Sequence, residues 1–251
     1  MKNMVEFGNT PSLPYSVEEA INRLRINISF LGSDVRKIMI VSSEPNEGKS
    51  FLALNLWNQM AEAGEKTIMV DADMRNSTLY AKYDLRREDG KEMKGLSHFL
   101  AGSAGLDEVL LHTKYGKGDL LPNVENTVNP SMLLESEKFG RLLDALAKPY
   151  RYVFVDAPPL GLVSDAERIG NMCDGAILCV RSAMTPKSIV KESVRQLERA
   201  DCPLLGIVLN RVNENKGGYY SRYGRYGKYG RYGKYGRYGR YYNEYYGTGD
   251  K

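Results

Sequence analysis

The 251-residue chain is poor in cysteine and histidine and has no long apolar run. Its three cysteines (Cys173, Cys179 and Cys202) form no CxxC pair and are odd in number, so we expect small core residues in a reducing compartment. His98 and His112 lack metal-ligand spacing and are interpreted as surface or packing residues. The first residues lack the apolar core of a signal peptide, and no stretch approaches the roughly 18 apolar residues of a membrane span. These absences predict a cytoplasmic protein.

Charge divides the chain into two parts. Residues 216–251 contain nine Lys or Arg and two Asp or Glu, a net charge of +7. The whole chain carries +4, which leaves −3 for residues 1–215. We therefore predict a mildly acidic folded domain over 1–215 and a disordered basic tail over 216–251.

Short apolar runs alternate with helical periodicity over the first 215 residues. Strands are predicted at VRKIMIVSS, KTIMVDAD, RYVFVDAPP, DGAILCV and PLLGIVLN. Helices are predicted at 18–31 (with Ser16 and Glu19 as a capping box), at 49–63 (ended by Gly64), at 131–147, near 164–171, and after Thr185 and Pro186. This pattern predicts a doubly wound α/β fold, a mostly parallel sheet with helices on both faces.

The stretch SSEPNEGKS, residues 42–50, lies between the first predicted buried strand and a helix, the context that a phosphate-binding P-loop requires. The stretch departs from the usual pattern GxxxxGK[ST] at one position, because Ser43 stands where the pattern has its first glycine. A chance GKS in an ordinary turn is the less favoured alternative. Backbone N–H groups and the helix N-terminus would bind phosphate, Lys49 would reach the outer phosphates, and the Ser50 hydroxyl would ligate Mg²⁺. The predicted nucleotide contacts are Pro45, Asn46, Glu47, Gly48, Lys49, Ser50 and Phe51, with Asn46 suited to positive φ.

Three aspartates end two of the predicted strands. Asp71 and Asp73 follow IMV, and Asp156 follows YVFV. Ligands of open α/β sheets bind beyond the carboxyl ends of the strands, so we expect all three carboxylates near the phosphates. There they can hold Mg²⁺, usually through its waters, and one can face an acceptor hydroxyl. A turn or helix-cap role would explain one aspartate more easily than three.

The P-loop, the strand ending in DxDxR, the strand ending in Asp156 and a C-terminal tyrosine cluster together resemble the bacterial tyrosine kinases of capsule and exopolysaccharide assembly. These kinases belong to the P-loop superfamily that includes MinD- and ParA-type ATPases. The resemblance covers essentially the whole chain, including NPSMLLESEKFGRLLDAL. It implies ATP and Mg²⁺ as cofactors. It also implies that Lys49, Asp71, Asp73 and Asp156 are catalytic, that Ser50, Asp73 and Asp156 serve the metal, and that Asn210 and Arg211 contact the nucleotide.

Two positions depart from the related sequences. The ExxRxxR oligomerisation motif of the family reads Glu19, Asn22, Arg25 here. The resemblance still implies a homo-oligomer, of which a ring is one form, and a solvated charged helix face is the alternative. MinD- and ParA-type ATPases carry a signature lysine at the second P-loop position, where this chain has Glu44. With Glu44 there, the chain lacks the positive charge that one subunit of those ATPases extends to the nucleotide of the other. This difference favours a kinase over a MinD- or ParA-type ATPase.

Residues 220–246 read YSRYGRYGKYGRYGKYGRYGRYYNEYY, with tyrosine at nearly every third position. The absence of proline argues against a collagen-like helix. Glycine would keep such an array extended, and each phosphate adds about −1.5 to −2 charges, so four or five would cancel the charge of the tail. The predicted phosphoacceptors are Tyr219, Tyr220, Tyr223, Tyr226, Tyr229, Tyr232, Tyr235, Tyr238, Tyr241, Tyr242, Tyr245 and Tyr246.

The resulting prediction is an ATP-dependent protein-tyrosine autokinase that phosphorylates its own tail in trans and regulates polysaccharide synthesis and export. The resemblance implies a transmembrane activator of the polysaccharide co-polymerase type, a cognate phosphotyrosine phosphatase, and recruitment to the inner face of the cell membrane. No nucleic-acid partner is expected. The alternative is a MinD- or ParA-like ATPase whose tail binds RNA or an acidic polymer.

Overall fold

A nine-stranded sheet organises residues 3–10, 12–127 and 129–212, the part of the chain that the computed structural model describes. The predicted phosphoacceptors and the predicted boundary at residues 215–216 lie outside these residues. The strands are β1 (Met4–Phe7), β2 (Lys37–Ser42), β3 (Thr67–Asp71), β4 (Leu85–Arg87), β5 (Leu111–Thr113), β6 (Gly118–Leu121), β7 (Tyr152–Asp156), β8 (Gly175–Arg181) and β9 (Leu204–Asn210). The helices are α1 (Tyr15–Ser29), α2 (Lys49–Glu62), α3 (Leu79–Lys82), α4 (Leu96–Ala101), α5 (Leu106–Val109), α6 (Pro130–Leu134), α7 (Glu137–Leu146), α8 (Asp165–Asn171) and α9 (Lys187–Arg199).

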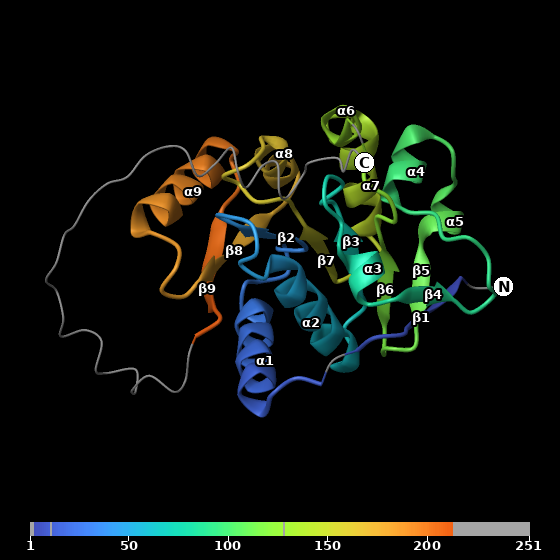
Figure 1. Ribbon diagram of the computed structural model, residues 1–251, viewed down its shortest axis with the longest axis horizontal. Coiled ribbons are helices and arrows are strands. Elements are labelled where there is room, and N and C mark those ends of the chain that lie inside the picture. Colours follow the sequence, from blue (N-terminus) through green and yellow to red (C-terminus); the bar gives the residue numbers. More distant parts are fainter. Residues whose placement is uncertain (1–2, 11, 128, 213–251) are drawn as a thin grey trace, which may run out of the picture.

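The strand order is β4-β1-β5-β6-β3-β7-β2-β8-β9, with β4 and β9 at opposite edges (Figure 1). From β6 to β9 every pair of neighbours is parallel. β5 runs antiparallel to β6, and β4 runs antiparallel to β1. The carboxyl ends of β2, β3, β7, β8 and β9 therefore meet at one edge of the sheet, where ligands of open α/β folds bind.

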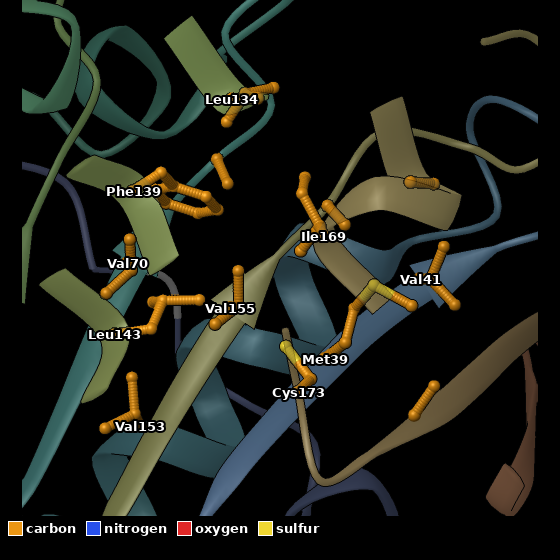
Figure 2. Packing of buried hydrophobic residues seen from close by; sticks show 14 of the residues in the cluster. Met39, Val41, Val70, Leu134, Phe139, Leu143, Val153, Val155, Ile169 and Cys173 are labelled. Carbon is orange, nitrogen blue, oxygen red and sulfur yellow. The ribbon is translucent and has the colours of Figure 1, made fainter. Parts of the chain in front are cut away.

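Each face of the sheet has its own hydrophobic core, because side chains alternate along a strand. In β2, Met39 and Val41 pack with α4 to α9, whereas Ile38 and Ile40 pack with α1 to α3. Figure 2 shows the first of these cores, in which side chains of α7 and α8 lie over β2, β3 and β7. Trp57 of α2 is 1% exposed in the second core. Helices on both faces of a mostly parallel sheet confirm the predicted doubly wound α/β fold.

Two helices begin differently from the prediction. α1 begins at Tyr15 after Pro14, whose ψ of 143° is extended, and no side chain caps the helix. Ser16 lies inside the first turn, so the predicted capping box is wrong. α9 begins at Lys187 after an extended Pro186, again without a side-chain cap. In both cases the preceding proline sets the entry of the helix.

The helix predicted over 131–147 is two helices, α6 and α7. Ser136 interrupts it with an extended ψ of 141°. Its hydroxyl donates to the carbonyl of Leu133 at 2.6 Å, a local bond that competes with the helical ladder. The end of α2 is as predicted, because Gly64 follows it at φ +91°. The amides of Gly64 and Glu65 close that end on Ala61 and Met60.

The three cysteines are free and buried, as predicted. Burial raises the pKa of the Cys179 and Cys202 thiols to about 12, so neither is a reactive thiolate at neutral pH. Within the described ranges, no helix combines the length and the hydrophobicity needed to cross a bilayer.

Candidate active site

The loop between β2 and α2 has the backbone geometry that was predicted for it. Asn46 has a φ of 61°, which confirms the expectation that this asparagine adopts positive φ. Gly48 has a φ of 95°, and a Cβ there would come within 2.2 Å of Asn210 Nδ2. Asn210 Nδ2 in turn donates to the carbonyl of Glu47 at 2.8 Å. The last residue of β9 therefore contacts the loop directly, and only glycine fits position 48.

Glu47 braces this loop with a side chain that is only 2% exposed. Its carboxylate accepts hydrogen bonds from the backbone amide of Glu44 at 2.9 Å, from the backbone amide of Arg181 at 3.2 Å, and from the hydroxyl of Thr185. Thr185 thus binds the P-loop and does not cap α9. The carbonyl of Glu47 is held as well, by Asn210 Nδ2, so both ends of this residue are fixed to other parts of the fold.

Ser43 stands where the usual pattern has its first glycine, and the structure shows what accommodates it. Its side chain is fully buried, and its hydroxyl lies 2.9 Å from the Ser193 hydroxyl of α9. The segment after β7 holds the loop from another side, since the amides of Leu160 and Gly161 donate to the carbonyls of Ser42 and Ser43 at 2.9 and 3.0 Å. Strand-end segments far apart in sequence therefore fix the loop.

The three aspartates converge behind the P-loop lysine, as predicted. Lys49 Nζ lies 2.8 Å from Asp73 Oδ2, 3.3 Å from Asp156 Oδ1 and 3.2 Å from Ser50 Oγ. Asp71 and Asp156 are register partners on the neighbouring strands β3 and β7. Each of the three carboxylates is at most 2% exposed. One buried cation thus faces three buried acids.

This imbalance of charge perturbs the acids. Burial and the neighbouring Asp156 raise the pKa of Asp71 to about 8, against a lowering by the hydrogen bond from the Ser77 hydroxyl at 2.6 Å. Burial also raises the pKa of Asp156, and the Lys49 charge opposes that shift. Such an excess of buried negative charge fits a divalent cation. Within the described ranges, no group of three or more His, Cys, Asp or Glu residues has a geometry that could hold a metal ion.

A cavity of about 500 Å³ opens beside this cluster. The aspartates do not line it, but Lys49 and Ser50 do. Seven of the nine predicted nucleotide contacts line it: Asn46, Gly48, Lys49, Ser50, Phe51, Asn210 and Arg211. Pro45 and Glu47 do not. Sequence reasoning missed three lining residues that follow the DxDxR motif, Asn76, Thr78 and Lys82.

Comparison with known proteins agrees with this geometry. Residues 35–170 match a family model described as an AAA domain. Tyrosine-protein kinase CpsD of Streptococcus agalactiae serotype III is 36% identical over 202 residues, which is 80% of this chain and 85% of that relative. The chain belongs to the bacterial tyrosine-protein kinases.

Solved structures of such kinases share its fold. The kinase domain of Escherichia coli tyrosine kinase ETK superposes with a TM-score of 0.72 at 28% identity, covering 88% of this chain and 87% of that domain. The chimerical protein CapA2B2 gives a TM-score of 0.72 at 33% identity, covering 81% and 88%. MinD of Pyrococcus horikoshii with Mg-ADP, at 24% identity and a TM-score of 0.61, shows the shared fold alone, covering 72% of each chain.

The predicted oligomerisation residues of this kinase lie at helical spacing on α1 and are not among the residues that line the cavity. Arg25 Nε and Nη2 donate to Asn22 Oδ1 at 3.1 and 2.9 Å. Glu19 Oε1 lies 3.6 Å from Arg23 Nε. The asparagine at the altered position therefore holds Arg25 along its own helix.

Neither histidine belongs to the site. His98 Nδ1 accepts the amide of Gly95 at 3.3 Å, and His112 Nδ1 lies 2.8 Å from Asp119 Oδ1. Both are packing residues, as predicted.

Proposed function

We propose that this kinase transfers the γ-phosphoryl group of ATP to tyrosine hydroxyls, and that its acceptors are the tail tyrosines of a neighbouring copy. The observation that carries the proposal is the contact of Lys49 with buried Asp73 and Asp156 beside the cavity of about 500 Å³. The chain that leaves this cavity after Arg211 continues into twelve tyrosines, Tyr219 to Tyr246.

ATP would bind with its phosphates on the backbone N–H groups of residues 46–50 and the N-terminus of α2. Lys49 would then exchange part of its contact with the aspartates for the outer phosphates. Asn210 and Arg211, at the end of β9, would contact the nucleoside, because they line the same cavity.

The residues present fit Mg²⁺ by their chemistry, an alcohol and carboxylates, which are the oxygen ligands that this ion takes. Ser50, Asp73 and Asp156 would hold it. When bound, it would supply positive charge to the phosphates during transfer. Lys49 and the loop amides stabilise the same charge, and the fixed positions of these groups supply most of the rate.

Asp71 would orient the acceptor. A tyrosine hydroxyl has a pKa near ~10, so an aspartate does not remove its proton before transfer begins. In a loose transition state the proton leaves late, and Asp71 would receive it then as a carboxylate, the form that a cation bound nearby would favour. In this structure the Ser77 hydroxyl lies 2.6 Å from Asp71 Oδ2, in the position on the carboxylate that the tyrosine hydroxyl would take. Because Asp71 is 2% exposed, the 72–78 segment must shift before an acceptor reaches it.

The charge of the tail would make transfer self-limiting. A tail of +7 is attracted to a body of −3, and about four or five phosphates would cancel the charge behind that attraction. The kinase would assemble through Glu19, Asn22 and Arg25 of α1 and release its neighbours' tails as phosphate accumulates. A transmembrane co-polymerase would recruit it to the membrane and activate it, a phosphatase would reset it, and capsular or exopolysaccharide export would respond.

Intact mass spectrometry tests the proposal. Wild-type kinase is mixed with Lys49→Met kinase and MgATP, with the cytoplasmic segment of its membrane activator present, and ATP consumption is measured in parallel. We expect phosphate on the Lys49→Met tail, and none when the Lys49→Met protein is alone. Consumption of ATP without added tail mass would identify an ATPase and overturn the proposal. Phosphate on the wild-type tail alone would overturn transfer between copies.

A further inference from the structure

The arginine of the DxDxR motif does not line the nucleotide cavity. Arg75 Nε donates to Asp165 Oδ2 at 2.7 Å, and Arg75 Nη2 donates to Ser131 Oγ at 2.8 Å. The Ser131 hydroxyl donates to Asp165 Oδ1 at 2.7 Å, which closes a three-membered network. The side chain of Asp165 is 3% exposed and that of Arg75 is 20% exposed.

These three residues join segments that carry the site. Arg75 lies two residues after Asp73, in the segment that follows β3. Asp165 is the first residue of α8, at the end of the segment that begins with Asp156, and Ser131 lies in α6. The network therefore ties the segment bearing Asp73 to the segment bearing Asp156.

Further bonds extend this connection. The amide of Thr127 donates to the carbonyl of Met74 at 2.9 Å, and the Asn76 amide lies 3.3 Å from Asp73 Oδ1. The segment between Asp156 and Asp165 in turn holds the P-loop through its backbone amides, as described above. All three segments that surround the P-loop are thus linked, and the Arg75 network adds a partly buried ion pair to this link.

We propose that Arg75, Asp165 and Ser131 form a partly buried clamp that positions Asp73 and Asp156 around the metal without touching nucleotide. The three are positioning residues, and the inference rests on the proposed function in taking Asp73 and Asp156 to serve Mg²⁺. Nothing in the DxDxR pattern names Asp165 or Ser131, which lie 90 and 56 residues further along the chain.

The shape of the arginine side chain makes the clamp testable. A guanidinium presents Nε and Nη2 in a rigid plane, so it binds two acceptors on different elements at once. A lysine keeps the charge that balances buried Asp165 but has one nitrogen on a flexible stem. Arg75→Lys should therefore fold but not hold Asp165 and Ser131 at the same time. Arg75→Ala would leave the charge of buried Asp165 unpaired, and the protein could unfold for that reason alone.

The variants are Arg75→Lys, Ser131→Ala and their combination. Arg168→Ala is the matched control, because Arg168 Nε pairs with Glu135 Oε1 at 3.6 Å between α8 and the end of α6, but with side chains 59% and 48% exposed. Three quantities are measured on the full chain: the thermal midpoint, the affinity for ATP in EDTA and in Mg²⁺, and the Mg²⁺ concentration that half-saturates nucleotide binding.

In Arg75→Lys we expect half-saturation to need about threefold to tenfold more Mg²⁺, with ATP affinity in EDTA within about twofold of wild type. The kcat of tail phosphorylation should fall by about tenfold or more. Ser131→Ala should shift in the same direction but less, and the combined variant should be no worse than Arg75→Lys. Arg168→Ala should match wild type.

Two results would overturn the clamp. One is a folded Arg75→Lys protein with wild-type Mg²⁺ dependence. The other is a parallel loss of ATP affinity in EDTA, which would place Arg75 on phosphate. If Arg75→Lys does not fold, Ser131→Ala decides by the same criteria, since it leaves the ion pair in place. Nucleotide binding needs no phosphoryl transfer, so this test stands apart from failure of the proposed function.

Discussion

Asp71 carries the largest electrostatic consequence at the scale of single residues. An unfolded aspartate loses its proton near pH ~4, whereas Asp71 in the folded chain holds it to about pH 8. Between these values the folded state binds more protons than the unfolded state, so the free energy of unfolding falls as pH rises through that window. The charge that supports the proposed reaction therefore costs stability when no ligand is bound.

Asp71→Asn should stabilise the ligand-free chain. We expect its free energy of unfolding to match that of wild type near pH 4 and to exceed it by on the order of 1–3 kcal/mol at pH 8, measured by urea unfolding in EDTA. The same variant should bind ATP and lose most tail phosphorylation. Asp89→Asn is a control of opposite sign, because hydrogen bonds from Arg87 lower the pKa of Asp89. A lower stability of Asp71→Asn at pH 8 would contradict the assignment.

Two glycines with similar backbone angles should respond differently to alanine. Gly48 and Gly64 have φ of 95° and 91°, but a Cβ at Gly64 would meet no atom of the described residues within 4 Å. Gly64→Ala should lose about 1–2 kcal/mol of stability from strain alone and keep its ATP affinity. Gly48→Ala adds a clash with Asn210 and should lose about tenfold or more in ATP affinity by calorimetry. Equal ATP affinities in the two variants would refute the close fit of β9 against the loop.

Single residues were predictable from sequence where a motif places them at a strand end. Lys49 was found from the P-loop pattern that follows a strand, and the three aspartates because they end buried apolar runs. Ser43, Glu47 and Arg75 have partners 150, 138 and 90 residues away, so no local pattern announces their roles. Asn76, Thr78 and Lys82 lie where the sequence has no periodicity.

At the scale of elements, strand length decided which strands could be predicted from the sequence. β2, β3, β7, β8 and β9 have five to seven residues each and read as apolar runs. β1, β4, β5 and β6 have three or four and were not predicted, because a strand so short shows no alternation. The break between α6 and α7 lies at Ser136, whose hydroxyl bonds the carbonyl of Leu133. The apolar residues on both sides keep helical periodicity, so the sequence pattern did not predict the break.

The junction between β8 and α9 should influence nucleotide binding. Thr185→Val removes the hydroxyl bond to buried Glu47 with little change in shape, so we expect a loss of about 1–2 kcal/mol in stability. ATP affinity should fall about threefold to tenfold by fluorescence titration, because the loop loses a brace. Ser188→Ala, at an exposed position in the first turn of α9, should change neither the stability nor the ATP affinity. An unchanged ATP affinity in Thr185→Val would show that the loop keeps its shape without α9.

For the whole molecule, the altered position in α1 should limit assembly. Asn22 holds Arg25 along its own helix, whereas Asn22→Arg would place two like charges one turn apart and direct both outward. We expect Asn22→Arg to lower the dissociation constant of the homo-oligomer by about threefold or more, and Arg25→Ala to raise it. Light scattering over a concentration series measures both. Identical masses for wild type and both variants would favour a simply solvated helix face.

The Ser43–Ser193 contact has an evolutionary consequence. A buried hydroxyl without a partner costs roughly 1–3 kcal/mol, so Ser43 depends on Ser193, whereas the Ser193 hydroxyl also lies 3.1 Å from the carbonyl of Ile189. Relatives that regain glycine at position 43 are free to carry an alanine or a valine at position 193, and the two sites should covary across the lineage. A genome search that demands a strict glycine at the start of the loop would overlook kinases that solved the same packing problem with a pair of alcohols.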